Sequence, residues 1–490
     1  MSDKPNVLFL VLDAVRYDHV GCYGYERDTT PAIDALAREG VRYEHAFAPS
    51  IWTPSVHGAI FTGKYPSHTG IYGNSLGFPD NLETLPETLK REGYRTFAAA
   101  AGAHIRASRG YDRGVDEFVS TRRISPDLGF FRKVVGDRSF AKQVGFSLTR
   151  GPDDKTRYKY DRLKRFISSS VADDTPFFGF INAKTAHQPF NPPRPYKRLF
   201  CEDLSRPSIE VIERLRGKLG LSTQTLTNHD TDRIRTVAHS GGDEVLAGEI
   251  ELTEEEWSVI ESWYDGAIRY LDDLIENLLE HLREVNAYED TLIVVTSDHG
   301  DNFGDHGLTS HIFNLYDSIV RGPLVIKPPG DDESKKIDNQ VTLLDLHRTF
   351  LDVASARDPN PEYEFTTSLH PFKERQYHDH TFCEYAGFEG PIERLNRKFP
   401  DLDVTQYART FQSIRDDRYK LIIDSSENKE LYAWRDDPRE QDDLSDMEQP
   451  VVEGLATVLE DSLGTLDKPG EFETPDDPEL DAQLKDLGYL

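Results

Sequence analysis

The side chains best suited to chemistry follow two apolar runs that lie far apart in the chain. Asp13 follows the run at residues 6–12, and Asp298 and His299 follow the run at residues 291–296. Both runs are short, apolar on both faces and rich in β-branched residues, which is typical of buried parallel strands. Ligands bind at the carboxyl ends of the strands in such sheets. We therefore expect two carboxylates and an imidazole to meet at one sheet edge and bind a divalent cation.

A third segment, residues 52–63, carries a hydroxyl group that could join this site. Thr53 suits the N-cap of a helix, Pro54 its first position and Gly63 its end. An N-cap hydroxyl lies beside free backbone N–H groups at the positive end of the helix dipole, where tetrahedral oxyanions bind. If Thr53 also contacts the cation, it can act as a nucleophile. The alternative is that Thr53 only caps the helix.

The composition excludes several classes of partner. The 490 residues include 87 Asp and Glu against 57 Lys and Arg, a formal net charge of -30. Binding of nucleic acid or anionic membranes through a basic surface is therefore excluded. The acidity is spread along the chain and favours a salt-loving source, because salt screens the self-repulsion. No run approaches the ~20 apolar residues that span a bilayer, and no signal peptide is evident, so we expect a soluble, cytoplasmic protein.

Strand and helix patterns alternate along most of the chain, which predicts an α/β fold with a mostly parallel sheet sandwiched by helices. Strands are expected at residues 6–12, 95–101, 176–181, 291–296 and 323–326. Helices are expected after Thr30, Thr84 and Thr253 and around residues 343–353. Two polar stretches, about 120–170 and 200–250, are interpreted as irregular insertions over the rim of the sheet.

The character of the chain changes past about residue 370. Residues 419–423 and 430–434 flank a polar turn and predict an antiparallel hairpin. We therefore divide the chain into a catalytic domain, a smaller C-terminal α+β domain with an antiparallel sheet, and an acidic extended tail. The predicted boundaries are 1–370, 371–465 and 466–490.

In order and spacing, several motifs resemble the sulfatase family of the alkaline phosphatase superfamily, and the resemblance covers most of the chain. The matching segments are residues 6–24, 29–40, 61–70, 296–300, 304–307, 415–421, 430–432 and 437–441. Counting back from Thr62 and Gly63 puts Thr53 at the family's nucleophile position. The resemblance implies a metal-dependent hydrolase of sulfate esters.

The chain departs from the family at the nucleophile motif. A typical sulfatase has Cys or Ser there, matured to formylglycine, with Arg at a fixed offset. Here Thr53 and His57 stand at those two positions, and Ala14 replaces the aspartate next to Asp13. Threonine cannot become that aldehyde, so the route through an aldehyde hydrate is unavailable. Phosphodiesterases and phosphoglycerol-type transferases of the superfamily use a metal-bound threonine directly. Cleavage of a phosphodiester or phosphonate, or phosphoryl transfer, is therefore the alternative to sulfate ester hydrolysis.

The resemblance also implies a ligand set for one divalent cation, which is Asp13, Thr53, Asp298 and His299. A site that mixes carboxylates with one imidazole suits Mn²⁺ or Zn²⁺ at least as well as Ca²⁺ or Mg²⁺. The sequence offers no convincing ligands for a second metal, so we expect one. The substrate would be a small-molecule or glycan sulfate or phosphate ester, and the sequence does not indicate the oligomeric state.

Two further histidines complete the predicted catalytic set with Thr53 and His57. His187 resembles the family's substrate-side histidine and could protonate the leaving oxygen. His311 falls where the family often carries a Lys or His that contacts the transferred group. For His187 a purely structural role is the alternative.

Three other side chains are weaker candidates. Arg16 could hold a substrate oxygen or form an ion pair, and His306 could be a loop residue without a catalytic role. His104 lies near the place where the family has Lys-x-His, which is missing here. That absence and the altered nucleophile motif leave open a catalytically silent relative that only binds an anionic glycan or ester.

Overall fold

The structure is a computed structural model. It describes residues 4–72, 75, 77–100, 104–120, 155–188, 190, 192–200, 242–330, 334–361, 365–370, 377–387 and 389–464. The predicted tail at 466–490 lies outside the described residues, as do the parts of the predicted insertions at 121–154 and 201–241.

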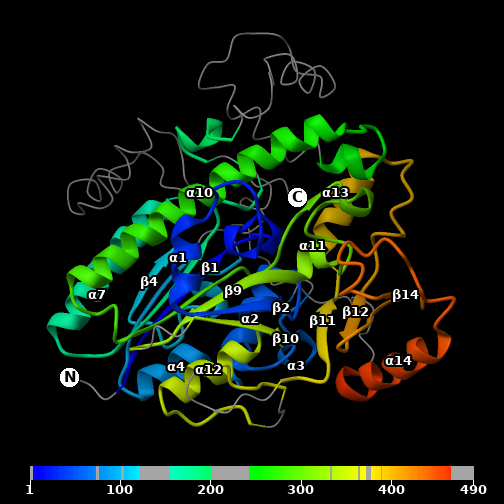
Figure 1. The fold of residues 1–490 in the computed structure, drawn as a ribbon. Coiled ribbons are helices and arrows are strands. Elements are labelled where there is room, and N and C mark those ends of the chain that lie inside the picture. Colours follow the sequence, from blue (N-terminus) through cyan, green and yellow to red (C-terminus); the bar gives the residue numbers. More distant parts are fainter. Residues whose placement is uncertain are drawn as a thin grey trace.

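Within the described residues, eight strands form one sheet in the order β10-β2-β9-β6-β1-β5-β3-β4 (Figure 1). β1 runs parallel to β5 and β6, whereas β9 runs antiparallel to β2 and β6. The bounds are β1 Asn6–Leu12, β2 Val41–Phe47, β3 Arg95–Ala100, β4 Glu117–Ser120, β5 Phe177–Ala183, β6 Thr291–Thr296, β9 Arg321–Lys327 and β10 Lys335–Thr342. The mostly parallel sheet is confirmed.

Helices cover both faces of this sheet, α1, α7 and α10 on one face and α2, α4 and α12 on the other (Figure 1). Their bounds are α1 Pro31–Glu39, α7 Thr156–Ala172, α10 Glu254–Glu284, α2 Thr53–Thr62, α4 Leu85–Arg91 and α12 Asp345–Val353. Alternate residues of β1 enter the two cores, Leu8, Leu10 and Leu12 on one face and Val7, Phe9 and Val11 on the other. Burial on both faces explains why this strand is apolar throughout.

The helix starts predicted after Thr30, Thr84 and Thr253 are confirmed, and α4 and α10 begin with capping boxes at Thr84 and Thr253. The sequence analysis missed β2, β4 and β10. The interpretation of residues 120–170 as irregular was wrong where α7 forms. The composition of this helix is polar on average. Its buried side chains recur at helical spacing, so the helix forms an apolar stripe. Those side chains are Tyr160, Leu163, Phe166 and Ile167.

A second sheet is antiparallel, in the order β11-β12-β13-β14, and contains the predicted hairpin (Figure 1). Its strands and flanking helices are β11 Thr381–Tyr385, β12 Phe411–Arg415, β13 Lys420–Asp424, β14 Lys429–Tyr432, α13 Glu389–Lys398 and α14 Gln449–Leu463. The short elements are η1 Tyr17–His19, η2 Gly21–Tyr23, α3 Pro66–Thr69, η3 Ala107–Arg109, η4 Tyr196–Arg198, β7 Asn302–Phe303, η5 Asp305–Gly307, β8 Thr309–Ser310 and α11 Asp317–Val320. None of the described helices is long and apolar enough to cross a bilayer.

The start of α12 is held by a buried ion pair. Asp345 accepts hydrogen bonds from the backbone N–H groups of Thr342 and Thr367, and its Oδ1 lies 2.7 Å from Nε2 of His378. Burial by itself would lower the pKa of His378, but the Asp345 carboxylate outweighs burial and raises this pKa above its usual value. The folded state therefore favours the protonated ring.

We expect this pair to make stability depend on pH. The unfolded chain has a histidine pKa of about 6.5, so the contribution is complete below that pH and is lost as the pH rises through the higher folded value. A charge-assisted hydrogen bond of this kind contributes about 1 kcal/mol. Urea unfolding between about pH 6 and pH 8.5 should show this decline in the native chain, and His378→Gln should make the decline smaller.

His380 provides the matched control, because it lies two residues away and the described structure gives it no hydrogen bond to Asp345. The His380→Gln variant should keep the full pH dependence. An unchanged slope in His378→Gln would contradict the assignment.

Candidate active site and metal centre

Two neighbouring parallel strands deliver the predicted cation ligands to one edge of the sheet. Asp13 directly follows β1, and Asp298 and His299 follow β6. Nε2 of His299 lies 3.8 Å from Oδ1 of Asp13 and 3.8 Å from Oδ2 of Asp298. The same nitrogen lies 3.2 Å from Oγ1 of Thr53. The structure therefore brings all four predicted ligands together, and we name them the carboxylate site.

The atoms that face each other in this site suit a divalent cation. Oδ1 of Asp13 and Oδ2 of Asp298 are buried and have no hydrogen-bond partner. The other oxygen of Asp298 accepts hydrogen bonds from the backbone N–H groups of Ala14 and His299. Nδ1 of His299 donates to the Gly300 carbonyl at 2.9 Å, so in the neutral ring Nε2 carries a lone pair. Two orphaned carboxylate oxygens and one imidazole lone pair are a ligand set for a cation.

The charges of the site are only partly balanced by the chain itself. Burial and the negative charge of Asp298 raise the pKa of Asp13 to about 7, although His299 and Lys184 act in the opposite direction. A buried carboxylate without a partner is costly. A bound divalent cation would relieve this cost.

The backbone around the site is held in uncommon geometry. Ala14 has a φ of 65°, in the left-handed region that few non-glycine residues adopt. Its N–H donates to Oδ1 of Asp298 at 3.2 Å, which links the two strand ends. Gly300 passes so close to α11 that a Cβ there would lie 2.0 Å from the Ser318 carbonyl oxygen. Only glycine therefore fits next to His299.

Thr53 does not occupy the predicted N-cap position. The helix α2 begins at Thr53 itself, Trp52 is the N-cap, and the backbone N–H of Val56 donates to the Trp52 carbonyl. The prediction was wrong by one residue, because Pro54 also fits the second position of a helix. The Thr53 hydroxyl makes no capping bond and instead faces Nε2 of His299. The interpretation that Thr53 only caps the helix is therefore wrong.

His57 lies in the core next to the carboxylate site. It is fully buried, and its ring packs against Phe61 and Phe180. Its Nδ1 lies 2.7 Å from the Thr53 carbonyl oxygen and 3.9 Å from Oδ2 of Asp298. Burial lowers the pKa of His57 and outweighs the negative charge of Asp298, which raises it. A neutral ring is therefore favoured. This places His57 where it can fix the backbone of Thr53.

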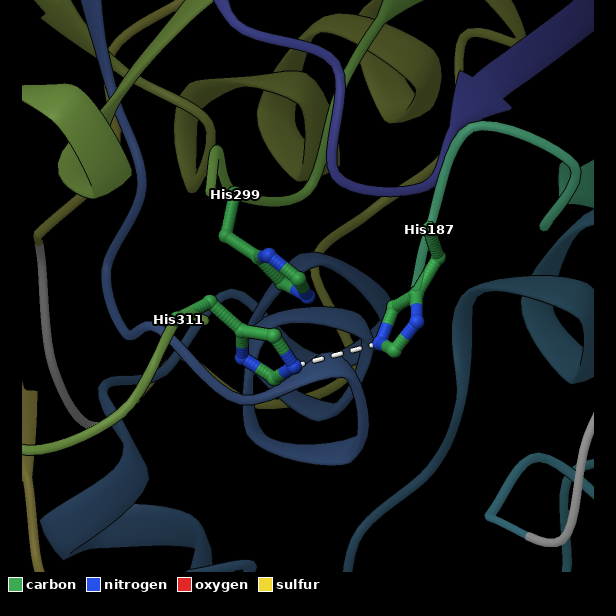
Figure 2. Close-up of side chains that lie close together, drawn as sticks. All are labelled: His187, His299 and His311. Carbon is green, nitrogen blue, oxygen red and sulfur yellow. Dashed lines mark hydrogen bonds between the residues drawn. The ribbon is translucent and has the colours of Figure 1, made fainter. Parts of the chain in front are cut away.

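Two more histidines lie beside His299, and Figure 2 shows the three rings turned toward one another. His187 follows β5, and His311 follows β8. Their Nε2 atoms are 3.1 Å apart. The rings of His299 and His311 stack with centroids 4.1 Å apart. We name His187 and His311 the histidine pair.

Known proteins match both the fold and this arrangement of motifs. The family model described as Sulfatase matches residues 5–356, and the model described as N-sulphoglucosamine sulphohydrolase, C-terminal, matches residues 304–468. The chain belongs to the sulfatase family. Its members are hydrolases that use a divalent metal.

Two similar proteins and one similar structure show what the chain resembles. The uncharacterized sulfatase YidJ of Escherichia coli is 25% identical over 461 residues, which cover 90% of this chain and 83% of that protein. The N-acetylglucosamine-6-O-sulfatase of Bacteroides thetaiotaomicron is 22% identical over 492 residues, which cover 90% of this chain and 83% of that protein. The crystal structure of a phosphonate monoester hydrolase of Agrobacterium radiobacter has a TM-score of 0.68 at 20% identity and covers 93% of this chain and 95% of its own.

The sequence analysis missed one charged residue of this sulfatase site. Lys184 directly follows β5 and is 8% exposed. Its positive charge acts on Asp13, His187 and His311, and it adds to the burial that lowers the pKa of both histidines well below the usual value. The strand-end rule that found Asp13 could also have found Lys184, because β5 lies next to β1.

The weaker candidates lie outside the carboxylate site. Arg16 forms ion pairs with Asp18 and Asp305, which confirms the alternative of an ion pair. His306 is exposed, and its ring stacks on that of Tyr316. The ring of His104 packs against Trp52, with centroids 5.0 Å apart.

We expect Mn²⁺ to stabilise the native chain and a chelator to reverse this effect. A ligand at 100 times its Kd stabilises the folded state by about 2.7 kcal/mol, and about 1 kcal/mol moves the Tm of a large domain by about 2 °C. Asp13→Asn should abolish the Mn²⁺ effect. Without metal the same variant should melt above the native chain, because the repulsion between Asp13 and Asp298 is gone.

Thermal melts with and without Mn²⁺ measure both effects. Asp305→Asn serves as the control, because Asp305 pairs with Arg16 outside the site, and it should keep the Mn²⁺ response. An Mn²⁺ response of native size in Asp13→Asn would rule out the carboxylate site as the place where the cation binds.

Proposed function

We propose that this chain hydrolyses sulfate esters of small molecules or glycans, with Thr53 as the nucleophile. The observation that carries the proposal is the position of the Thr53 hydroxyl. It lies 3.2 Å from Nε2 of His299, in a cluster with two carboxylate oxygens that have no other partner. Family membership supports the reaction class.

The residues that would hold the divalent cation are Asp13, Asp298, His299 and Thr53. Bound there, the cation would lower the pKa of the Thr53 hydroxyl and offset negative charge on the ester oxygens. Mn²⁺ and Zn²⁺ suit this mixture of carboxylate, hydroxyl and imidazole ligands. His57 would keep the Thr53 oxygen in place through its hydrogen bond to the Thr53 carbonyl.

The reaction would proceed in two displacements. In the first, the Thr53 oxygen forms a bond to sulfur while the bond from sulfur to the alcohol oxygen breaks, and the proton lost by the Thr53 hydroxyl leaves on the alcohol. In the second, water cleaves the Thr53 ester and releases the inorganic anion. His187 and His311 lie next to this centre, and a free Nε2 lone pair there would pass that proton to the leaving oxygen.

The net charge of the site supports a substrate with a single negative charge. Asp13, Asp298 and Lys184 together leave one negative charge, which a divalent cation converts into one positive charge. A sulfate monoester carries one negative charge at its reactive group. A phosphodiester and a phosphonate monoester carry one as well.

The threonine itself favours a second candidate function, which is hydrolysis of phosphodiesters or phosphonates, or phosphoryl transfer. A threonine hydroxyl is a nucleophile that needs no conversion to an aldehyde. The site charge fits these substrates as well as sulfate esters. Direct comparison of substrates separates the two functions.

We expect the native chain with Mn²⁺, at molar salt, to turn over at least one of p-nitrophenyl sulfate, phenylphosphonate esters and bis-p-nitrophenyl phosphate. Thr53→Ala should lower the rate by about 10⁴-fold or more, because no nucleophile is left. Ser55→Ala is the matched control, since Ser55 is buried in the same helix turn. Mass spectrometry of the trapped enzyme should find the added sulfate or phosphate on Thr53. Lack of turnover with metal bound would favour the catalytically silent alternative.

We expect His187→Gln to affect poor leaving groups most. Proton transfer to a leaving oxygen is typically worth about 10²–10⁴-fold, and an alkyl alcohol depends on it. p-Nitrophenolate leaves without such help, so the aryl ester should lose much less. Rates for the two esters in the same variant measure the difference. An equal loss for both would show that His187 only supports the structure.

A further inference from the structure

The turn that follows β1 holds Asp13 in place although its own backbone geometry is unfavourable. Ala14 is fully buried and has a φ of 65°, which few residues other than glycine adopt. For an L-residue this geometry is disfavoured by roughly tenfold or more in population. Contacts from elsewhere in the fold must therefore hold the turn.

Tyr264 of α10, a helix that covers one face of the sheet, supplies two of these contacts (Figure 1). Its hydroxyl donates to the Ala14 carbonyl oxygen at 2.8 Å and accepts from the backbone N–H of Arg16 at 2.7 Å. The side chain is fully buried, and its ring packs against the rings of Phe190 and Phe303. The donor and one lone pair of the hydroxyl are thus both used on one turn.

This turn in its own way orients both carboxylates of the carboxylate site. The N–H of Asp13 donates to the Ala183 carbonyl at 3.0 Å, and the N–H of Ala14 donates to Oδ1 of Asp298 at 3.2 Å. Oδ1 of Asp13 and Oδ2 of Asp298 then remain without a hydrogen-bond partner among the described residues. A flip of the peptide between Asp13 and Ala14 would give Ala14 a common negative φ and turn its N–H away from Asp298. Both carboxylates would lose their orientation together.

Position 14 is also a place where this chain departs from the sulfatase pattern, which has an aspartate there. Ala14 offers the site its backbone N–H and no carboxylate. With fewer candidate ligands, binding of a cation depends more strongly on how the remaining ones are oriented. Hydrogen bonds that orient metal ligands are typically worth about 10–100-fold in metal affinity.

We propose that Tyr264 is a positioning residue for the carboxylate site. Its hydroxyl holds the left-handed turn at Ala14, so that Asp13 and Asp298 present their free oxygens to the cation. Tyr264 is not itself a ligand, because its hydroxyl is engaged by the backbone. This role rests on the cation binding of the proposed function, and it does not depend on Thr53 acting as a nucleophile.

Titration of the metal-free full chain with Mn²⁺, followed by calorimetry, tests the proposal. The Tyr264→Phe variant removes only the hydroxyl and keeps the ring that packs in the core. We expect its Kd for Mn²⁺ to be weaker than the native value by about 10–100-fold.

Tyr23→Phe is the matched control for the loss of a bridging hydroxyl. The Tyr23 hydroxyl donates to the Tyr43 carbonyl at 2.9 Å and accepts from the Leu324 N–H at 2.8 Å, so it joins β2 to β9 and contacts no residue of the carboxylate site. This variant should lose stability in urea and keep the native Kd. A general loss of stability would therefore not imitate the expected result.

A second substitution tests whether Tyr264 acts through the turn. Glycine adopts a positive φ about as readily as a negative one. In the Tyr264→Phe background, Ala14→Gly should therefore recover roughly tenfold in Mn²⁺ affinity. In the native background the same substitution should leave the Kd nearly unchanged, because Tyr264 already holds the turn. A loss of packing would not be recovered in this way, since glycine adds no contact.

Hydrogen exchange of the native chain provides a measurement that needs no variant. Coupling between two sites is reciprocal, so Mn²⁺ should slow exchange of the Arg16 N–H, which bonds the Tyr264 hydroxyl. It should slow exchange of the Leu324 N–H, which bonds the Tyr23 hydroxyl, much less. Equal slowing of both would contradict the proposal, even if Tyr264→Phe does not fold.

The outcomes separate this proposal from the proposed function. A native Kd in Tyr264→Phe, or a loss that Ala14→Gly does not recover, would overturn the positioning role alone. A native chain that binds no Mn²⁺ would overturn both the positioning role and the metal-dependent reaction. The expected losses of Mn²⁺ affinity without turnover of any ester would support the role of Tyr264 and count against Thr53 as a nucleophile.

Discussion

The mutual repulsion of Asp13 and Asp298 is the constraint on which the rest of the site depends. Each carboxylate has one oxygen that is buried without a hydrogen-bond partner, and burial together with Asp298 raises the pKa of Asp13 to about 7. Two such groups persist at one sheet edge only if the fold holds them there and a positive charge offsets them. Lys184 supplies one such charge from the neighbouring strand end. A bound divalent cation would supply the remainder.

The fold holds this site through contacts that lie outside it. Asp317, in α11, accepts hydrogen bonds from Arg415 and Lys420, which belong to the second sheet, and all three side chains are buried. α11 also contacts the loop that carries His299, since Gly300 donates to the Ile319 carbonyl. His311 lies on the segment that leads into α11. The second sheet therefore fixes two of the three clustered histidines without supplying a ligand.

Residues at strand ends could be predicted from the sequence, because the position of a parallel strand end follows from the apolar run before it. This is why Asp13, Asp298 and His299 meet as expected. Contacts that depend on side-chain direction could not be predicted in this way. The first turn of α2 starts one residue early, which turns the Thr53 hydroxyl away from its own helix. β2 carries the alternation of apolar and polar residues that is typical of a strand and could have been found from it, whereas α7 was missed because charged residues surround its apolar stripe.

Two buried histidines near the site, His57 and His311, share one electrostatic consequence. His57 stands where the sulfatase pattern has an arginine, and His311 stands where that pattern has a lysine or a histidine. Burial lowers the pKa of both rings, so they add no positive charge at neutral pH. The cationic side chain that acts on Asp13, His187 and His311 alike is Lys184. In the proposed reaction, charge that develops on a sulfuryl or phosphoryl group would therefore have to be offset by the bound cation to a greater degree than the family pattern requires. The proposed threonine nucleophile fits this change, because a bound cation would activate its hydroxyl without a neighbouring arginine.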